Sequence, residues 1–180
     1  MTTTMHRVAA AVIVLAIAGA PAAYAEGDKV TPVRSEKLPN VPGKSLTAVV
    51  VNYAPGGKSA SHHHAGSVLA YVLTGSIRSE KLPNVPGKSV TTVLVNYAPG
   101  GKSVSHHHAG SVMAYVLTGQ IRSENSATGP AKVYKAGEAF FEPPGSEHLV
   151  SENASTTEPA SLLAIFVADD GAQLTTFEKK

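Results

Sequence analysis

The sequence contains no cysteine and no tryptophan among its 180 residues. Without cysteine it can form no disulfide, even in an oxidising compartment, and it has no cysteine to which a lipid anchor could be attached. An excess of charge of either sign is also missing, since the formal net charge is only +2, and the basic residues form no cluster. A nucleic acid is therefore not expected as a partner.

Long hydrophobic runs are missing as well. The longest, Val8 to Ala18, has 11 residues, whereas a membrane-spanning helix needs roughly 20. It follows a start with one positive charge, Arg7, and precedes the A-x-A pattern of Ala23 to Ala25. We predict that residues 1–25 are a secretory signal peptide, with a membrane anchor as the alternative. The mature protein would be periplasmic or secreted, and free of the membrane.

Glycine and proline are plentiful, and the apolar residues are mostly valine, leucine and alanine. This composition favours many short strands separated by turns over helices. The length that remains after residue 25 suits one domain with a substantial core.

A segment of the chain occurs twice. Residues 34–77 are repeated at once as residues 78–121, with six conservative differences, and the tripeptide Arg-Ser-Glu recurs at 34, 78 and 122. We interpret this as a duplication by slipped recombination between short matches. A two-blade or solenoid architecture is the alternative, although solenoids generally need three or more repeats.

Short apolar, β-branched runs bounded by turn residues predict the strands. In the two copies they are 46–53, 67–73, 90–97 and 111–117, and beyond the repeat they are 131–135, 139–141, 148–150 and 162–167. Such even spacing is typical of an all-β sandwich or closed barrel.

Histidines carry the clearest chemical signal. In a strand, His106 and His108 point the same way and His107 points the other way. Two imidazoles suit a transition metal, but a site needs a third ligand. His148, just after the rigid turn of residues 143–145, is the only other histidine outside the repeat and the signal. The alternative is a polar strand end without metal.

The spacing of these residues resembles the cupin superfamily over nearly the whole mature chain. The first cupin motif, G(X)5HXH(X)3-4E(X)6G, is matched by Gly100, His106, His108 and Gly119. The second, G(X)5PXG(X)2H(X)3N, is matched by Gly137, Pro143, Gly145 and His148, with Asn153 one residue late. The resemblance implies a cupin-type β-barrel, or jelly roll, with His106, His108 and His148 as inward-facing metal ligands.

The motif's glutamate is missing, because Val112 stands in its place. Glu142 is then the best substitute ligand or general base, with a solvated loop carboxylate as the alternative. Tyr115 is a second candidate for proton transfer, with packing in the core as its alternative. No other cofactor-binding pattern is found.

The duplication raises the question of which copy completes the barrel. Copy two runs directly into the second motif, whereas using copy one would force 44 residues to loop out between paired strands. We therefore predict a signal at 1–25, extra strands at 26–77 and the barrel at 78–180, with the reverse choice of copies as the alternative. His62 and His64 of copy one are then less suitable ligands. The extra strands would pair with a barrel edge or with a second subunit in a homodimer.

Two functions of different class fit these residues. One is a metalloenzyme whose single divalent ion, Fe, Zn, Mn, Cu or Ni, activates water or binds dioxygen together with an anionic small molecule. The other is a non-catalytic periplasmic module that binds a metal or a small ligand. A purely structural role is the third alternative, because fold alone does not decide function.

Overall fold

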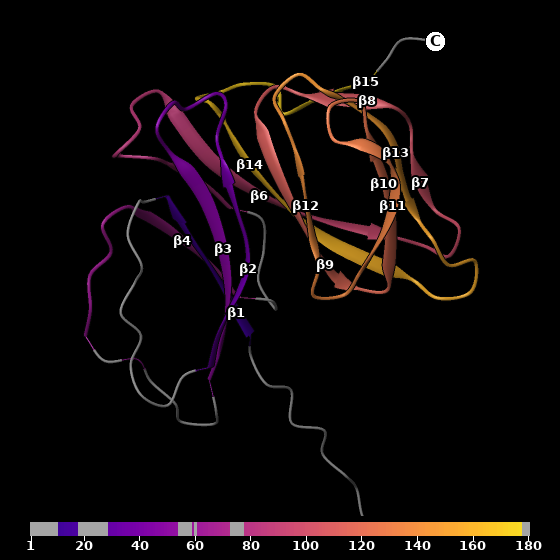
Figure 1. Ribbon diagram of the computed structural model, residues 1–180, viewed down its shortest axis with the longest axis horizontal. Helices are drawn as coiled ribbons and strands as arrows, with labels where there is room; N and C mark the ends of the chain where they lie inside the picture. Colours follow the sequence, from indigo (N-terminus) through magenta and orange to yellow (C-terminus); the bar gives the residue numbers. More distant parts are fainter. Residues whose placement is uncertain (1–10, 18–28, 54–58, 60, 73–77, 178–180) are drawn as a thin grey trace, which may run out of the picture.

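The computed structural model describes residues 11–17, 29–53, 59, 61–72 and 78–177. Within these ranges every regular element is a β-strand (Figure 1), which confirms the all-β prediction. No helix that could cross a membrane occurs among the described residues. The predicted signal cleavage site at 23–25 lies outside them.

The strands keep the order of the chain. They are β1 (Ala11–Ile17), β2 (Lys29–Lys37), β3 (Ser45–Asn52), β4 (Ser67–Val72), β5 (Arg78–Lys81), β6 (Lys88–Tyr97), β7 (Lys102–Ser103), β8 (His106–His108), β9 (Ser111–Thr118), β10 (Gln120–Asn125), β11 (Gly129–Lys135), β12 (Ala139–Glu142), β13 (Glu147–Asn153), β14 (Ala160–Asp169) and β15 (Thr175–Phe177).

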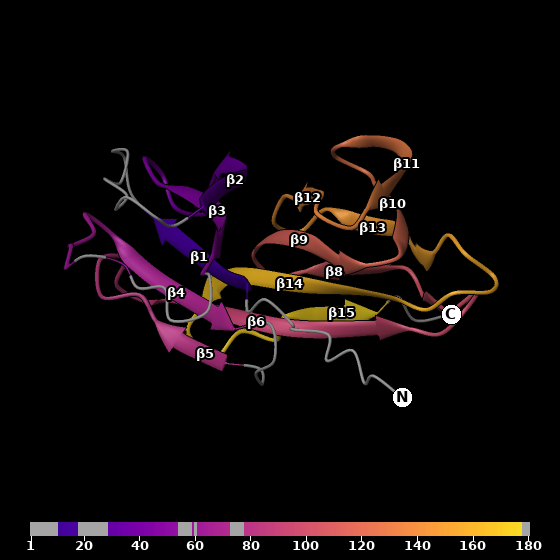
Figure 2. The same cartoon turned by 90° about the horizontal axis from the view of Figure 1, so that it is seen from below.

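The strands form three antiparallel sheets. The first has the order β2-β3-β1-β4 and contains the strands of copy one. The second has the order β12-β9-β14-β6-β5, and the third has the order β11-β10-β13-β8-β15, with β7 also paired to β13. Copy two therefore shares its sheets with the strands that follow the repeat. Figures 1 and 2 show the first sheet at one end of the molecule and the third at the opposite end, while the long strands β6 and β14 of the second sheet run between them.

The second sheet is buried on both faces. Its middle strand β14 alternates between two hydrophobic clusters: Leu162, Ala164 and Phe166 face one, while Leu163, Ile165 and Val167 face the other. A strand covered on both sides needs no polar positions, which explains the continuous apolar run predicted at 162–167. The first of these faces lines the same cavity as His106, His108 and His148.

Copy one covers the other face of this sheet. Leu46 and Ala48 of β3 are fully buried in the same cluster as Leu163 and Ile165. A hydrogen bond also joins copy one to β14: Asn40 donates through Nδ2 to the Val167 carbonyl at 2.8 Å. The strands of copy one are thus layered onto the outside of the sheet to which copy two belongs.

The predicted signal segment takes part in the first sheet. β1 lies between β3 and β4 and pairs with both. The signal peptide itself remains a prediction. If it is removed on export, β3 and β4 lose the strand that joins them.

Candidate metal centre

The pair of histidines predicted to face inward lies on β8, in the third sheet. His106 and His108 are each only 6% exposed, while His107 between them is half-buried. β8 is held between β13 and β15, which fixes the direction of its side chains. The period of two along a strand therefore sends two imidazoles into the interior and one outward.

His148 meets this pair from the neighbouring strand. It lies on β13 directly opposite His106 in the antiparallel register, and it is buried. The turn before it is tied to β8, because the Gly145 amide donates to the His108 carbonyl at 2.8 Å. Gly145 has a φ of +70°, a conformation that only glycine adopts readily. One candidate ligand atom from each of the three imidazoles lies within 4.8 Å of the others.

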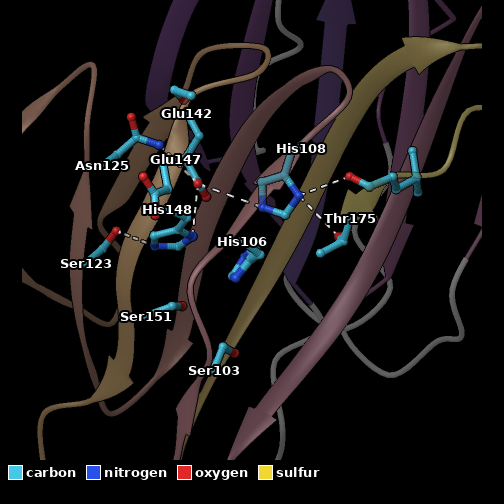
Figure 3. A network of polar contacts seen from close by, with 12 residues as sticks. Ser103, His106, His108, Ser123, Asn125, Glu142, Glu147, His148, Ser151 and Thr175 are labelled. Atoms are coloured by element: carbon cyan, nitrogen blue, oxygen red, sulfur yellow. Dashed lines mark hydrogen bonds and ion pairs between the residues drawn. The ribbon is translucent and has the colours of Figure 1, made fainter. Parts of the chain in front are cut away.

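Backbone carbonyls fix the tautomers of the first two rings. His106 Nδ1 donates to the Val104 carbonyl at 2.7 Å, and His108 Nδ1 donates to the Leu174 carbonyl at 3.1 Å. The protons are thereby placed on Nδ1, which leaves the lone pairs of Nε2 for a metal. Thr175 Oγ1 also lies 3.1 Å from His108 Nδ1. Figure 3 shows these contacts behind the His108 ring.

The third ring carries a polar atom without a hydrogen bond. His148 Nε2 lies 2.9 Å from Ser123 Oγ, whereas the buried Nδ1 makes no hydrogen bond of good geometry among the described residues, although Glu142 Oε2 lies 2.9 Å from it. Buried nitrogens are almost always satisfied. A metal ion bound here would satisfy this one, so the three rings fit a metal ion both in number and in their unused atoms.

Burial favours the neutral rings that metal binding requires. It lowers the pKa of both His106 and His108 below the ordinary value of 6.5, chiefly because the charged forms lose hydration. The nearby Glu142 carboxylate opposes this shift, but more weakly. Neutral imidazole is the metal-binding form.

Glu142 is buried beside the rings at the end of β12. It is 2% exposed, so it is not a solvated loop carboxylate. Its Oε2 lies 2.9 Å from His148 Nδ1 and 3.8 Å from His108 Nε2. Asn125 Nδ2 donates to the same oxygen at 3.4 Å. Figure 3 shows the carboxylate between the His148 and His108 rings.

A cavity of about 210 Å³ opens onto these groups. Its wall is mostly apolar, and none of the described residues that line it is a lysine or arginine. The polar exceptions include Tyr97, whose hydroxyl contacts Ser103 Oγ at 2.7 Å and Ser151 Oγ at 2.9 Å. The residues that line it are Val93, Val95, Tyr97, Ser103, His106, His108, Val112, Ala114, Phe140, Glu142, His148, Ser151, Leu162, Ala164, Phe166, Leu174, Thr175 and Phe177.

Tyr115, the other residue proposed for proton transfer, lies elsewhere. It packs against the cluster on the far face of β9, whereas Val112 and Ala114 of the same strand line the cavity. Burial raises the pKa of its hydroxyl above the ordinary 10.0. His62 and His64 are exposed, with their Nε2 atoms 3.1 Å apart.

Sequence reasoning missed the polar residues behind the rings. Ser123 and Asn125 of β10 are buried with Ile121, in alternation with less buried residues. The alternation along β10 is a local pattern, but polar residues on one face of a strand normally indicate a solvent-exposed face. Only the pairing of β10 with β13 shows that this polar face is buried.

A family model described as "Cupin domain" matches residues 93–166. No curated protein sequence matches the chain significantly. Among solved structures, a protein of Klebsiella pneumoniae with a double-stranded β-helix domain is 25% identical, with a TM-score of 0.42 over 51% of this chain and 76% of its own. An oxalate oxidase in complex with glycolate is 22% identical, with a TM-score of 0.43 over 57% of this chain and 54% of its own.

A structure of DMSP lyases is 16% identical, with a TM-score of 0.44 over 50% of this chain and 44% of its own. The matched part thus spans about half the length of the lyase and oxidase chains.

Proposed function

Residues 93–166 are a cupin domain, and we propose that this domain works by holding one divalent metal ion through His106, His108 and His148. One observation carries the proposal: three buried imidazoles from two strands bring their ligand atoms within 4.8 Å of one another. Histidine ligation suits iron, zinc, copper or nickel, and manganese if a carboxylate joins the set.

The residues around the rings would transfer protons and exclude water. A divalent ion, when bound, would act as a Lewis acid toward an oxygen atom of water or ligand. Glu142 Oε2, adjacent to the His148 and His108 rings, is placed to accept or return a proton there. The apolar wall formed by residues such as Phe140 and Phe166 limits water around the ligand.

The cavity limits the ligand to a small molecule. Its volume of about 210 Å³ equals roughly seven water molecules at about 30 Å³ each. Because the described part of the wall contains no lysine or arginine, we propose that the charge of an anionic ligand is balanced at the metal. We therefore propose a compact, largely apolar ligand with a single oxygen-donor group, such as one carboxylate.

The second candidate is a module that binds a metal or small ligand without turnover. It is favoured by the small number of proton-transfer groups, since Glu142 is the only carboxylate among the described residues that line the cavity. In either case we propose that the protein acts outside the cytoplasm, on the strength of the signal-like residues 1–25.

Metal analysis of the full chain, purified without chelator, tests the metal site. We expect about one divalent ion per chain, lost in His148→Ala and kept in His107→Ala, whose ring is on the outward side of β8. Unchanged metal content in His148→Ala would contradict the proposed ligand set.

Turnover separates the two candidate functions. The metal-loaded protein is incubated with a panel of small carboxylic acids, and each acid is followed by NMR. Consumption of an acid supports the enzyme, whereas line broadening without consumption supports the binding module.

A further inference from the structure

Glu142 has an unusual environment. It is the only carboxylate among the buried side chains of the described residues. Removing a carboxylate from water is costly unless an opposite charge or several hydrogen bonds compensate. Among the described residues, no lysine or arginine lines its cavity, and its hydrogen bond from Asn125 is long, at 3.4 Å.

The side chains that lie within ion-pair distance of Glu142 are His148 and His108. They are also two of the three candidate metal ligands. A proton on either ring would compensate the carboxylate but would compete with metal binding. A divalent ion shared by the rings and the carboxylate would compensate Glu142 and use the lone pairs of the imidazoles at the same time.

The strand register gives a second, independent observation. Glu142 pairs directly with Val112 across β12 and β9. Directly paired residues in antiparallel strands project from the same face, with Cβ atoms roughly 4.5 to 5.5 Å apart, and both residues line the cavity. Val112 occupies the position where the first motif has glutamate. Glu142 therefore places a carboxylate on the same wall of the cavity as Val112, but from the adjacent strand β12.

We propose that Glu142 is a fourth protein ligand of the metal ion, replacing across the strand pair the glutamate that Val112 displaces. Bonds of about 2.1 Å to one ion place neighbouring ligand atoms roughly 3 to 4 Å apart. The distances from Glu142 Oε2 to the two ring nitrogens, 2.9 and 3.8 Å, fall close to this range.

This inference rests on the proposed function and sharpens it. With three neutral imidazoles and one carboxylate, a divalent site carries a net charge near +1 instead of +2. A ligand with one negative charge then neutralises the site fully. The carboxylate also extends the range of suitable metals toward manganese and iron, which accept oxygen ligands readily.

The competing role for Glu142 is to orient His148 without touching the metal. A transposition separates the two roles: Val112→Glu combined with Glu142→Val moves the carboxylate back across the strand pair. The full chain is loaded with Co²⁺, and its visible absorption and affinity are measured for the wild type, Glu142→Val, Glu142→Gln and the transposed variant. Glu147→Gln, on the neighbouring strand β13, is the matched control.

We expect Glu142→Val and Glu142→Gln to alter the Co²⁺ spectrum and to lower affinity at least 10-fold, with Glu147→Gln unchanged. The transposed variant should recover most of the affinity and the wild-type spectral intensity. A wild-type spectrum in both single variants would overturn the proposal. A folded transposed variant without recovery would assign Glu142 the orienting role instead.

Circular dichroism shows whether the transposed variant folds. If it does not, the Co²⁺ spectra of the two single variants still show whether Glu142 is a metal ligand. A wild-type protein that takes up no Co²⁺ would refute the proposed function itself, and the ligand role of Glu142 with it. Metal uptake by the wild type together with unaltered single variants would refute only the ligand role.

Discussion

The two copies of the repeated segment are nearly identical in sequence, yet only copy two buries the first and third of its three histidines. In copy two, His106 and His108 are buried on β8. In copy one, the equivalent His62 and His64 are exposed and belong to no strand. Both pairs have similar ring geometry, with centroids 4.8 Å and 4.7 Å apart.

The difference comes from the neighbours of each copy. β8 of copy two is flanked by β13 and β15, which come from the chain that follows the repeat. β13 supplies His148, and Leu174, directly before β15, supplies the backbone carbonyl that orients His108. Copy one pairs instead with β1 and β2. The same His-His-His segment thus presents buried imidazoles only where strands from later in the chain enclose it.

The largest expected effect tests whether copy one is part of the core. Leu46 and its counterpart Val90 are both buried in the same cluster. We expect Leu46→Ala to lower the free energy of unfolding by about 2 to 5 kcal/mol, because it removes a large side chain from a packed core. Chemical denaturation measures it, with Val90→Ala as the matched change. A loss below about 1 kcal/mol would show that copy one packs loosely.

Gly110 of copy two should tolerate substitution less well than Gly66, its counterpart in copy one. A Cβ at Gly110 would lie 2.2 Å from the Val167 carbonyl oxygen, which belongs to β14. We expect Gly110→Ala to cost about 1 to 3 kcal/mol, as overpacking does. β4 of copy one does not pair with β14, so Gly66→Ala should cost less in the same thermal or denaturant assay. Equal losses would argue that the two environments are alike.

The positions of eight strands could be predicted from the sequence, because alternation of apolar and polar residues and the turn residues between them are local signals. Each of the eight predicted ranges, among them 90–97 and 162–167, coincides with an observed strand to within a few residues. The direction of His106 and His108 also followed, from the period of two. These features depend on nearest neighbours along the chain.

The surroundings of Glu142 could not be predicted in the same way. Before Pro143 and Pro144 it looks like a turn residue, and its burial depends on the register of β12 against β9. That register is set by contacts between segments distant in sequence. Ser123 and Asn125 were missed for the same reason, since only the position of His148 shows which face of β10 is internal.

A smaller effect should appear with pH. Burial keeps the pKa of His106 and His108 in the folded chain below 6.5, whereas the unfolded chain titrates near 6.5. The unfolded state then binds more protons, so the metal-free protein should lose stability as pH falls below about 6.5. Metal affinity should fall only below the lowered pKa values.

Denaturant unfolding at pH 7.5 and 5.5 measures this loss. His106→Ala/His108→Ala should show a weaker pH dependence, whereas His62→Ala/His64→Ala should keep that of the wild type, because those side chains are exposed. An identical pH dependence in all three proteins would mean that burial of the site histidines does not control stability.

The smallest effect is expected at Tyr115. Because it packs on the face of β9 away from the cavity, Tyr115→Phe should leave metal affinity unchanged. Its stability should shift within about 0.5 kcal/mol, as for most substitutions without a buried partner lost. Isothermal titration with Zn²⁺ measures the affinity, and a clear loss would bring Tyr115 back as a residue of the site.

The most direct test of the account compares the two histidine pairs in the full-length chain. Metal content is measured in His106→Ala/His108→Ala and in His62→Ala/His64→Ala, purified side by side without chelator. We predict that the first variant loses its bound metal and the second keeps about one ion per chain. Equal loss in both, or loss only in the second, would contradict the conclusion that copy two and the strands after it form the metal centre.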